Sequence, residues 1–225
     1  MAMKKLYILK KLSLLLIIFS CSSNKDYDQL SKIFQLYNNQ FEEKPIKTFT
    51  KKEFEPFNYE IVEIKTNGVL KQGLMLPITR RYGYTNYITG SGQSFNTQGK
   101  LISKTNGVNI NLLSVEITPN PFLDKTNINN WPTKNIRTYS YLTPLNNTKT
   151  ITFHCSIKEK SYEEILILDT KLDVDKMIEK CSSRKYVFEN TYWLDKKGFI
   201  WKSRQWISPK NIFAELTVLK KDPNI

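Results

Sequence analysis

From residue 57 onward, the sequence is divided into short runs of β-branched and aromatic residues that are separated by turn-forming residues. Such runs are typical of β-strands, because these side chains pack well on a pleated surface. Asn67–Gly68 and Asn106–Gly107 are strong tight-turn dipeptides, since both residue types tolerate positive φ, and Gln98–Gly99 resembles them. Turns this short join antiparallel strands, so the sequence predicts a mainly β fold organised as an antiparallel meander.

The predicted strands account for most of the chain after residue 57. They lie at 59–65, 69–78, 83–88, 101–104, 108–117, 136–142, 148–157, 161–168, 185–194, 199–207 and 212–219. Segment 171–181 fits either a short helix or a strand, and 118–134 is expected to be a long loop. No internal repeat or interdomain linker is evident, so residues 21–225 are expected to form one domain.

One amphipathic helix is predicted before the β-rich part, at about residues 24–43. Apolar residues recur there mostly every three or four positions, which aligns them on one helix face. They are Tyr27, Leu30, Ile33, Phe34, Tyr37 and Phe41. The other face carries acids such as Asp28 and Glu42 instead of a lysine stripe, so the helix is expected to pack on the domain and not on a membrane.

Residues 1–20 are typical of a signal peptide. Four lysines among the first 11 residues precede a short apolar run at 12–19, which is too short to cross a bilayer about 30 Å thick. Ile18–Phe19–Ser20–Cys21 resembles a bacterial lipobox, which implies cleavage before Cys21 and attachment of acyl chains such as palmitate to it. The alternative is an uncleaved or an ordinary secretory signal.

The lipobox resemblance also implies a location. In bacterial lipoproteins, a residue other than Asp after the acylated cysteine directs sorting to the outer membrane, and Ser22 stands there. We therefore expect a protein that is anchored in outer-membrane lipid through Cys21 and faces the periplasm. Cys155 and Cys181 are the remaining cysteines, and an oxidising periplasm permits a disulfide between them. The alternative is two buried thiols that lie too far apart to bridge.

The charge of the chain is strongly positive, at +13, but its distribution does not favour nucleic-acid binding. Of the 34 basic residues, 29 are Lys and 5 are Arg, and they are scattered in dipeptides such as Arg80–Arg81. Nucleic-acid readers favour the arginine fork and clustered charge. A solvated basic surface is the simplest interpretation, and weak attraction to acidic polysaccharide or lipid headgroups is the alternative.

The motifs that mark common enzymes and metal sites are missing from the sequence. It lacks GxSxG, HExxH, a P-loop and paired Cys/His spacing, and His154 is its single histidine. Acids that a glycosidase would need are present but are expected to be surface residues. They are Glu163, Glu164, Asp169, Asp173 and Asp175. We therefore expect a protein that is not an enzyme and needs no cofactor or metal.

The C-terminal hairpin contains the most informative polar pattern. If residues 195–198 form its turn, Leu194 pairs with Phe199, Tyr192 faces Trp201 and Asn190 faces Ser203. One face then carries a polar set of Asn190, Ser203 and Gln205, while Trp193, Arg204 and Glu189 lie on the other, with an Arg204–Glu189 salt bridge. The polar set is expected to be an internal hydrogen-bond cluster. Alternatively, it is the floor of a glycan-binding groove in which Trp193, Trp201 or Trp206 stacks on sugars and Arg204 meets an acidic group.

Several segments resemble the YjbF (GfcB/YmcC) family of group 4 capsule polysaccharide lipoproteins. The matching segments are 190–195, Gly198, 203–205, 216–220, 99–105 and 56–59, with Lys100 where the family usually has arginine. The resemblance implies an antiparallel, barrel-like β domain, attachment to the outer membrane and work beside polysaccharide-secretion proteins. It supplies no catalytic residues.

Together these features predict a non-enzymatic accessory in the assembly or export of capsule or exopolysaccharide. It is expected to bind glycan or a partner outer-membrane protein. The alternatives are a periplasmic glycan-processing enzyme, which needs two carboxylates converging in one cleft, and a lipid-carrying barrel, which needs an apolar cavity.

Overall fold

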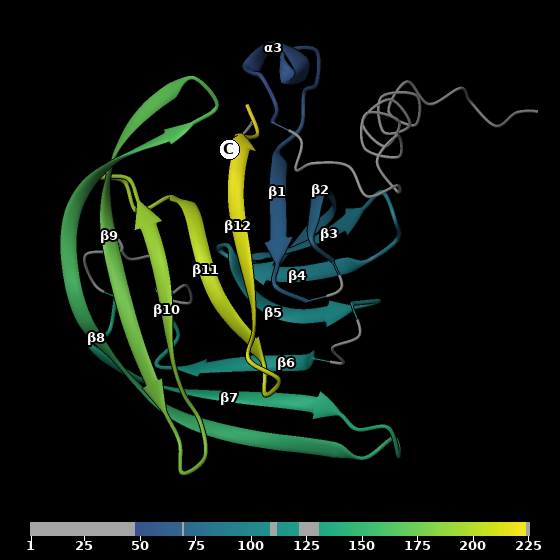
Figure 1. Ribbon diagram of the computed structural model, residues 1–225, viewed down its shortest axis with the longest axis vertical. Coiled ribbons are helices and arrows are strands. Elements are labelled where there is room, and N and C mark those ends of the chain that lie inside the picture. Colours follow the sequence, from purple (N-terminus) through teal and green to yellow (C-terminus); the bar gives the residue numbers. More distant parts are fainter. Residues whose placement is uncertain (1–47, 69, 109–111, 122–130, 224–225) are drawn as a thin grey trace, which may run out of the picture.

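The computed structural model describes residues 48–68, 70–108, 112–121 and 131–223. These residues form a short helix, α3 (Lys51–Phe54), and twelve strands (Figure 1). The strands are β1 (Ile61–Thr66), β2 (Gln72–Arg81), β3 (Tyr84–Thr89), β4 (Ser94–Gln98), β5 (Leu101–Asn106), β6 (Leu112–Thr118), β7 (Lys134–Leu142), β8 (Thr148–Ile167), β9 (Thr170–Ser182), β10 (Val187–Leu194), β11 (Ile200–Ser208) and β12 (Ile212–Lys220). The expected signal peptide, Cys21 and the helix at 24–43 lie outside the described residues. Within those described, no helix has the length and apolar character needed to cross a bilayer.

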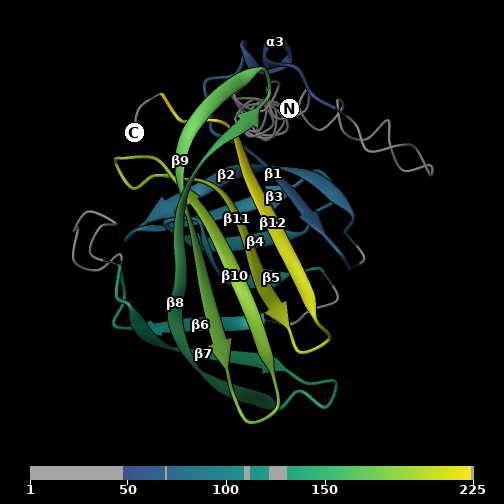
Figure 2. The ribbon, with the colours of Figure 1, turned by 60° about the vertical axis from the view of Figure 1, so that its left-hand side comes forward.

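All twelve strands belong to one antiparallel sheet that curves into a nearly closed barrel (Figures 1 and 2). Its order is β5-β4-β3-β2-β1-β12-β11-β10-β9-β8-β7-β6. Every hydrogen-bonded neighbour except one follows in sequence, and the exception is the pairing of β1 with β12, the first and last strands. The predicted mainly β, antiparallel, barrel-like meander is confirmed. Because β5 and β6 are the two ends of the sheet, the barrel has one seam between them.

The predicted strands agree with the structure except at three places. β4 was not predicted, because Ser94–Gln98 contains four polar residues around the single apolar side chain of Phe95. β8 is one strand of 20 residues where two were expected, with an irregularity in its pairing between Ile157 and Glu159. The ambiguous segment 171–181 belongs to a strand, β9.

The predicted turns differ in what they connect. Asn67–Gly68 lies between the paired strands β1 and β2, and Gly99 and Lys100 join β4 to β5 with φ of 52° and 75°. Asn106–Gly107 does not form the expected hairpin, because β5 and β6 lie at opposite ends of the sheet. Gly107 has the positive φ of a turn, 77°, but a reversal of the chain does not by itself make the flanking strands pair.

The interior of the barrel is filled by large side chains. Four aromatic residues, Tyr139, Phe153, Phe188 and Trp206, are buried and contact one another, and the Phe188 and Trp206 rings stack at 4.4 Å. On the opposite face of β1 and β2, Phe54 of α3 packs into a second cluster. The β8–β9 hairpin extends toward α3 (Figures 1 and 2), where Leu168 contacts this cluster.

Candidate functional site

The register of the β10–β11 hairpin differs from the predicted one by two residues over most of its length. Tyr192 lies opposite Ser203, and Trp193 lies opposite Lys202, so the predicted pairing of Tyr192 with Trp201 is wrong. Leu194 pairs with Ile200 instead of Phe199, so the turn is one residue longer than expected. A bulge between Trp193 and Leu194 in the pairing shifts the register by a second residue. A shift of two keeps Asn190, Tyr192, Ser203 and Gln205 on their predicted face, whereas the one-residue shift at the bulge puts Ile200 on that face as well, opposite Leu194.

The polar set of this hairpin lies inside the barrel. Asn190, Tyr192, Ser203 and Gln205 are at most 3% exposed. The Asn190 side chain accepts a hydrogen bond from the Trp206 backbone N–H at 2.8 Å. Gln205 reaches across the interior, where it accepts from the Ile102 N–H at 2.9 Å and donates to the Lys100 carbonyl at 2.8 Å and to Ser203 Oγ at 2.8 Å. These residues form an internal hydrogen-bond cluster rather than the floor of an open groove.

A buried ion pair that the sequence did not reveal is hydrogen-bonded to two members of this cluster, Asn190 and Tyr192. Arg137 on β7 and Glu179 on β9 are 1% and 0% exposed, and Nη2 of Arg137 lies 2.8 Å from Oε2 of Glu179. Asn135 and Asn190 donate to the Glu179 carboxylate at 2.8 and 2.9 Å, and Arg137 donates to the Tyr192 hydroxyl at 3.0 Å. Burial opposes the charge of Arg137, but the Glu179 carboxylate outweighs it and raises the Arg137 pKa. Burial also raises the pKa of Tyr192.

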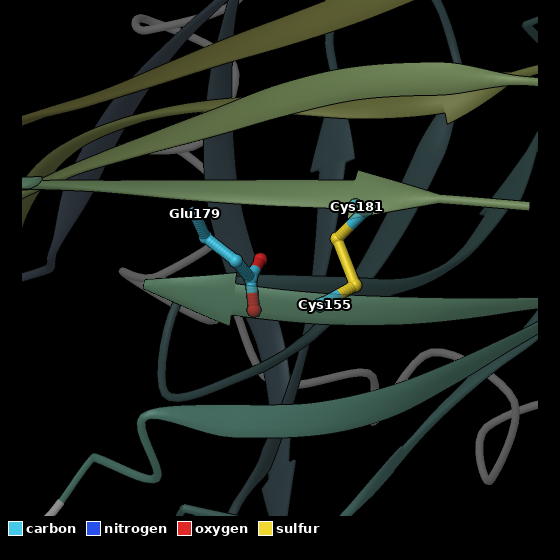
Figure 3. Close-up of side chains that lie close together, drawn as sticks. All are labelled: Cys155, Glu179 and Cys181. Carbon is cyan, nitrogen blue, oxygen red and sulfur yellow. A yellow bond between two sulfur atoms is a disulfide. The ribbon is translucent and has the colours of Figure 1, made fainter. Parts of the chain in front are cut away.

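A disulfide between Cys155 and Cys181 joins β8 and β9 next to this pair, and Figure 3 shows Glu179 beside it. The two sulfur atoms and a Glu179 oxygen lie within 4.8 Å of one another. The sulfurs are bonded to each other, and the carboxylate already accepts hydrogen bonds from Arg137 and two asparagines. The trio is therefore a structural unit of the core rather than a set of free ligands.

Of the remaining candidates, Trp206 is buried in the aromatic core of the barrel, whereas Trp193, Trp201 and Arg204 lie apart from the polar set. Lys202 lies over the Trp193 ring at 5.1 Å, and the Trp193 indole N–H donates to Glu163. Trp201 donates to Asp195 at 3.3 Å. The exposed Arg204 packs on the Phe213 ring at 3.7 Å instead of pairing with Glu189, whose carboxylate contacts Lys158 at 3.2 Å. The expected Arg204–Glu189 salt bridge is therefore wrong.

A charged groove lies at one end of the barrel, and we call it the end groove. It has a volume of about 470 Å³ and is formed by the β2–β3, β4–β5 and β10–β11 turns and the end of β12. Figure 2 shows the β10–β11 turn and the end of β12 on the same side of the molecule. The lining includes Glu60, Arg80, Arg81, Tyr82, Gly83, Tyr84, Thr85, Gly99, Lys100, Gly198, Phe199, Ile200, Lys221 and Asp222.

Glu60 organises the floor of the end groove. This carboxylate is 3% exposed and accepts hydrogen bonds from Lys100 at 2.5 Å, Arg80 at 2.9 Å and the Tyr87 hydroxyl at 2.6 Å. Arg80 also pairs with Asp222. Burial lowers the pKa of Lys100, although Glu60 opposes this shift. Two features of the sequence pointed to this site, the Arg80–Arg81 dipeptide and the lysine at position 100, but nothing in the sequence indicated that the Glu60 carboxylate joins Arg80 and Lys100.

Comparison with known proteins gives a family and a fold. Residues 32–219 match the profile of the family described as group 4 capsule polysaccharide lipoprotein gfcB, YjbF. The crystal structure of the hypothetical lipoprotein YmcC from Escherichia coli K12 is similar, with a TM-score of 0.65 and 18% identity over 84% of this chain and 94% of that chain. No curated protein matches the sequence. At this level of identity, the structural likeness supports the fold alone.

Proposed function

The chain belongs to the YjbF family of group 4 capsule polysaccharide lipoproteins, and from this membership we propose that it is a non-enzymatic accessory in the assembly or export of a surface polysaccharide. It works beside the proteins of the secretion machinery and binds either the polysaccharide or a partner outer-membrane protein. The end groove is the binding site in this proposal.

The proposal also includes an anchor. Acyl chains on Cys21 insert into outer-membrane lipid, and Ser22 directs the protein outward, so that the barrel faces the periplasm. The lipobox-like residues Ile18–Phe19–Ser20–Cys21 support this location. Several acyl chains on one cysteine hold a protein at a membrane far more firmly than a single chain does.

The observation that carries the proposal is the state of the carboxylates in the end groove. Both oxygens of Glu60 are occupied, Oε1 by Lys100 and Oε2 by Arg80 and Tyr87, and Asp222 is paired with the same arginine. A glycosidase needs one carboxyl group to give a proton to the glycosidic oxygen and another to assist attack, and both must face the substrate. The groove is thus suited to binding and not to acid–base catalysis. The filled interior of the barrel likewise gives no support to a lipid carrier.

A complementation experiment tests the accessory role. A deletion strain would receive the wild-type gene, a Cys21→Ala variant or a double variant of the groove, Arg81→Gln/Tyr84→Ala. We expect both variants to reduce polymer on the cell surface while total polymer stays near the wild-type amount. Equal surface polymer in all strains, or release of new sugar ends from the polymer by the purified protein, would contradict the proposal.

A further inference from the structure

The turn between β2 and β3 exposes an unusual group of side chains at the edge of the end groove. We call Arg81, Tyr82 and Tyr84 the turn rim. Tyr82 is 81% exposed and Tyr84 is 44% exposed, so both rings present a large apolar area to solvent. Isolated exposed aromatics are common, but here two of them lie beside a cationic groove.

The backbone at Tyr82 shows that turn stability alone does not account for this residue. Tyr82 and Gly83 have φ of 51° and 77°, the left-handed conformation that two-residue hairpin turns require. Asn is favoured at the first of these positions, whereas a bulky side chain there is strained. The Tyr82 ring contacts the Arg81 guanidinium, which lies 4.8 Å from the ring centroid, but it is otherwise exposed, so burial does not offset the strain. Strained residues of this kind cluster at binding sites.

The charges of the groove favour an anion. Four cations, Arg80, Arg81, Lys100 and Lys221, line it with two carboxylates, Glu60 and Asp222. Arg80 and Lys100 are held by these carboxylates, and Lys221 contacts Asp195 at 3.2 Å. Among the described residues, no carboxylate lies within ion-pair distance of Arg81, whose guanidinium donates to the Tyr82 hydroxyl at 3.1 Å. Arg81 is thus the cation that an incoming anion meets without competition.

We propose that the turn rim binds an acidic sugar unit of a polysaccharide. The planar guanidinium of Arg81 pairs with the carboxylate or phosphate of the sugar, for which its geometry is suited. The apolar C–H face of the sugar ring packs on Tyr82, the more exposed of the two rings, and is removed from water there. This inference rests on the proposed function, since it takes the end groove as the polysaccharide site, and adds that the recognised polymer is anionic.

Calorimetry with the full chain in detergent would test the proposal. The probes are oligogalacturonate and its methyl ester, which has the same rings without the charge. We expect oligogalacturonate to bind at least about tenfold more tightly than the ester, since a charged hydrogen bond is lost in the ester. Arg81→Gln and Tyr82→Asn should each weaken its binding by about tenfold. Arg204→Gln, which changes an exposed arginine on β11 outside the groove, should leave affinity unchanged.

Stability separates binding from folding in the same variants. Tyr82→Asn relieves the strain of the turn, so its melting temperature should equal or exceed that of the wild type while its affinity falls. Equal affinity for acid and ester, unchanged affinity in both rim variants, or displacement of oligogalacturonate by anionic phospholipid vesicles would overturn the proposal. If binding fails but the export phenotype of the groove variants remains, the accessory role stands without the acidic sugar. If binding holds but export is normal, the accessory role fails instead.

Discussion

Arg137 and Glu179 form the most deeply buried ion pair among the described residues, with side chains 1% and 0% exposed. Each charge lost its water when the barrel formed, and the other charge, the side-chain amides of Asn135 and Asn190 and the Tyr192 hydroxyl compensate for that loss. Removing one partner therefore leaves the other charge buried without a counter-ion. The pair also connects β7 to β9 across the intervening strand β8.

We expect Arg137→Met to lower the free energy of unfolding by about 3–5 kcal/mol, because it leaves the Glu179 carboxylate uncompensated. Urea unfolding of the purified protein measures the loss. The double variant Arg137→Met/Glu179→Leu should lose less than Arg137→Met alone. Lys171→Met, which breaks an exposed pair with Glu164, should change stability by less than about 1 kcal/mol. Equal losses in the buried and exposed variants would refute this account.

The sequence predicted the strand face on which a side chain lies better than it predicted the residues that the side chain contacts. Alternation along a strand was sufficient to put Asn190 and Tyr192 on one face, and a register error of two residues did not change that. Arg137 and Glu179 are 42 residues apart, so their contact depends on which strands become neighbours. One signal was available: Arg137 alternates with Asn135, Tyr139 and Tyr141, so the pattern places an arginine on the buried face of β7.

At the scale of the element, Asp195 holds the β10–β11 turn. Its Oδ1 accepts from the Lys197 and Phe199 backbone N–H groups at 3.0 and 2.9 Å, and its Oδ2 contacts Trp201 and Lys221. Partial burial acts to raise the pKa of the Asp195 carboxyl, but the Phe199 amide and the Lys221 ammonium together hold it below its usual value. The stabilisation is present above the unfolded pKa and is lost as pH falls through the lower folded pKa.

Asp195→Ala should therefore lower the free energy of unfolding by about 2 kcal/mol at pH 7. The difference from the wild type should shrink as pH falls below about 3.8, the ordinary aspartate pKa. Denaturant unfolding at several pH values measures this. Asp169→Ala, at an exposed aspartate in the β8–β9 turn, serves as the matched control and should have little effect at any pH. A difference that is constant down to pH 2 would argue against an ionised Asp195 as the cause.

The disulfide gives a prediction for another pair of elements, β8 and β9. Cys155 and Cys181 lie opposite each other on β8 and β9 and are separated by 26 residues in sequence. A crosslink that closes a loop of this length is worth about 3 kcal/mol through the unfolded state. We expect Cys155→Ala/Cys181→Ala to lose about that much, as measured by urea unfolding. Wild-type protein whose disulfide has been reduced in the unfolded state should lose the same amount of stability as the double variant. No loss in either protein would contradict the prediction.

Elements were predictable where they were apolar and regular. The β-branched and aromatic composition was sufficient to predict β1, β7, β11 and β12. β4 was not predicted, because the residues that pair with β3 and β5 through their backbones are mostly Ser, Asn, Thr and Gln. The length of the β10–β11 turn depends on the Asp195 contacts and on a bulge, which composition does not encode.

At the scale of the whole molecule, Gln205 connects opposite walls of the barrel near the seam. From β11 it bonds the Ile102 N–H and the Lys100 carbonyl, backbone groups of β5 and the turn before it. β5 is an end strand of the sheet, so its free edge lacks ladder partners. This side chain therefore provides part of what a neighbouring strand would supply.

Gln205→Ala should lower the free energy of unfolding by about 1–3 kcal/mol, because it leaves buried backbone groups unpaired. Hydrogen exchange should locate the effect. The amides of β5, above all that of Ile102, should exchange faster, whereas those of the β1–β12 ladder should change only as much as the loss of global stability requires. Uniform acceleration across the barrel would mean that Gln205 contributes to the core in general and not to the seam. The seam itself was not predictable, since Asn106–Gly107 has the sequence of an ordinary hairpin turn.

The pairing of β1 with β12 has a consequence for the making of the protein. Ile61 of β1 pairs with Lys220 of β12. During synthesis, the edge of β1 that does not pair with β2 therefore stays uncovered until β12, the last strand, has been made. Contacts so distant in sequence slow folding, and an uncovered edge invites pairing with other chains. In the order of the sheet, β12 is the one strand that joins β1–β5 to β6–β11. A premature stop codon before residue 212 would thus yield two separate sheets with four open edges, a product suited to aggregation rather than a slightly smaller barrel.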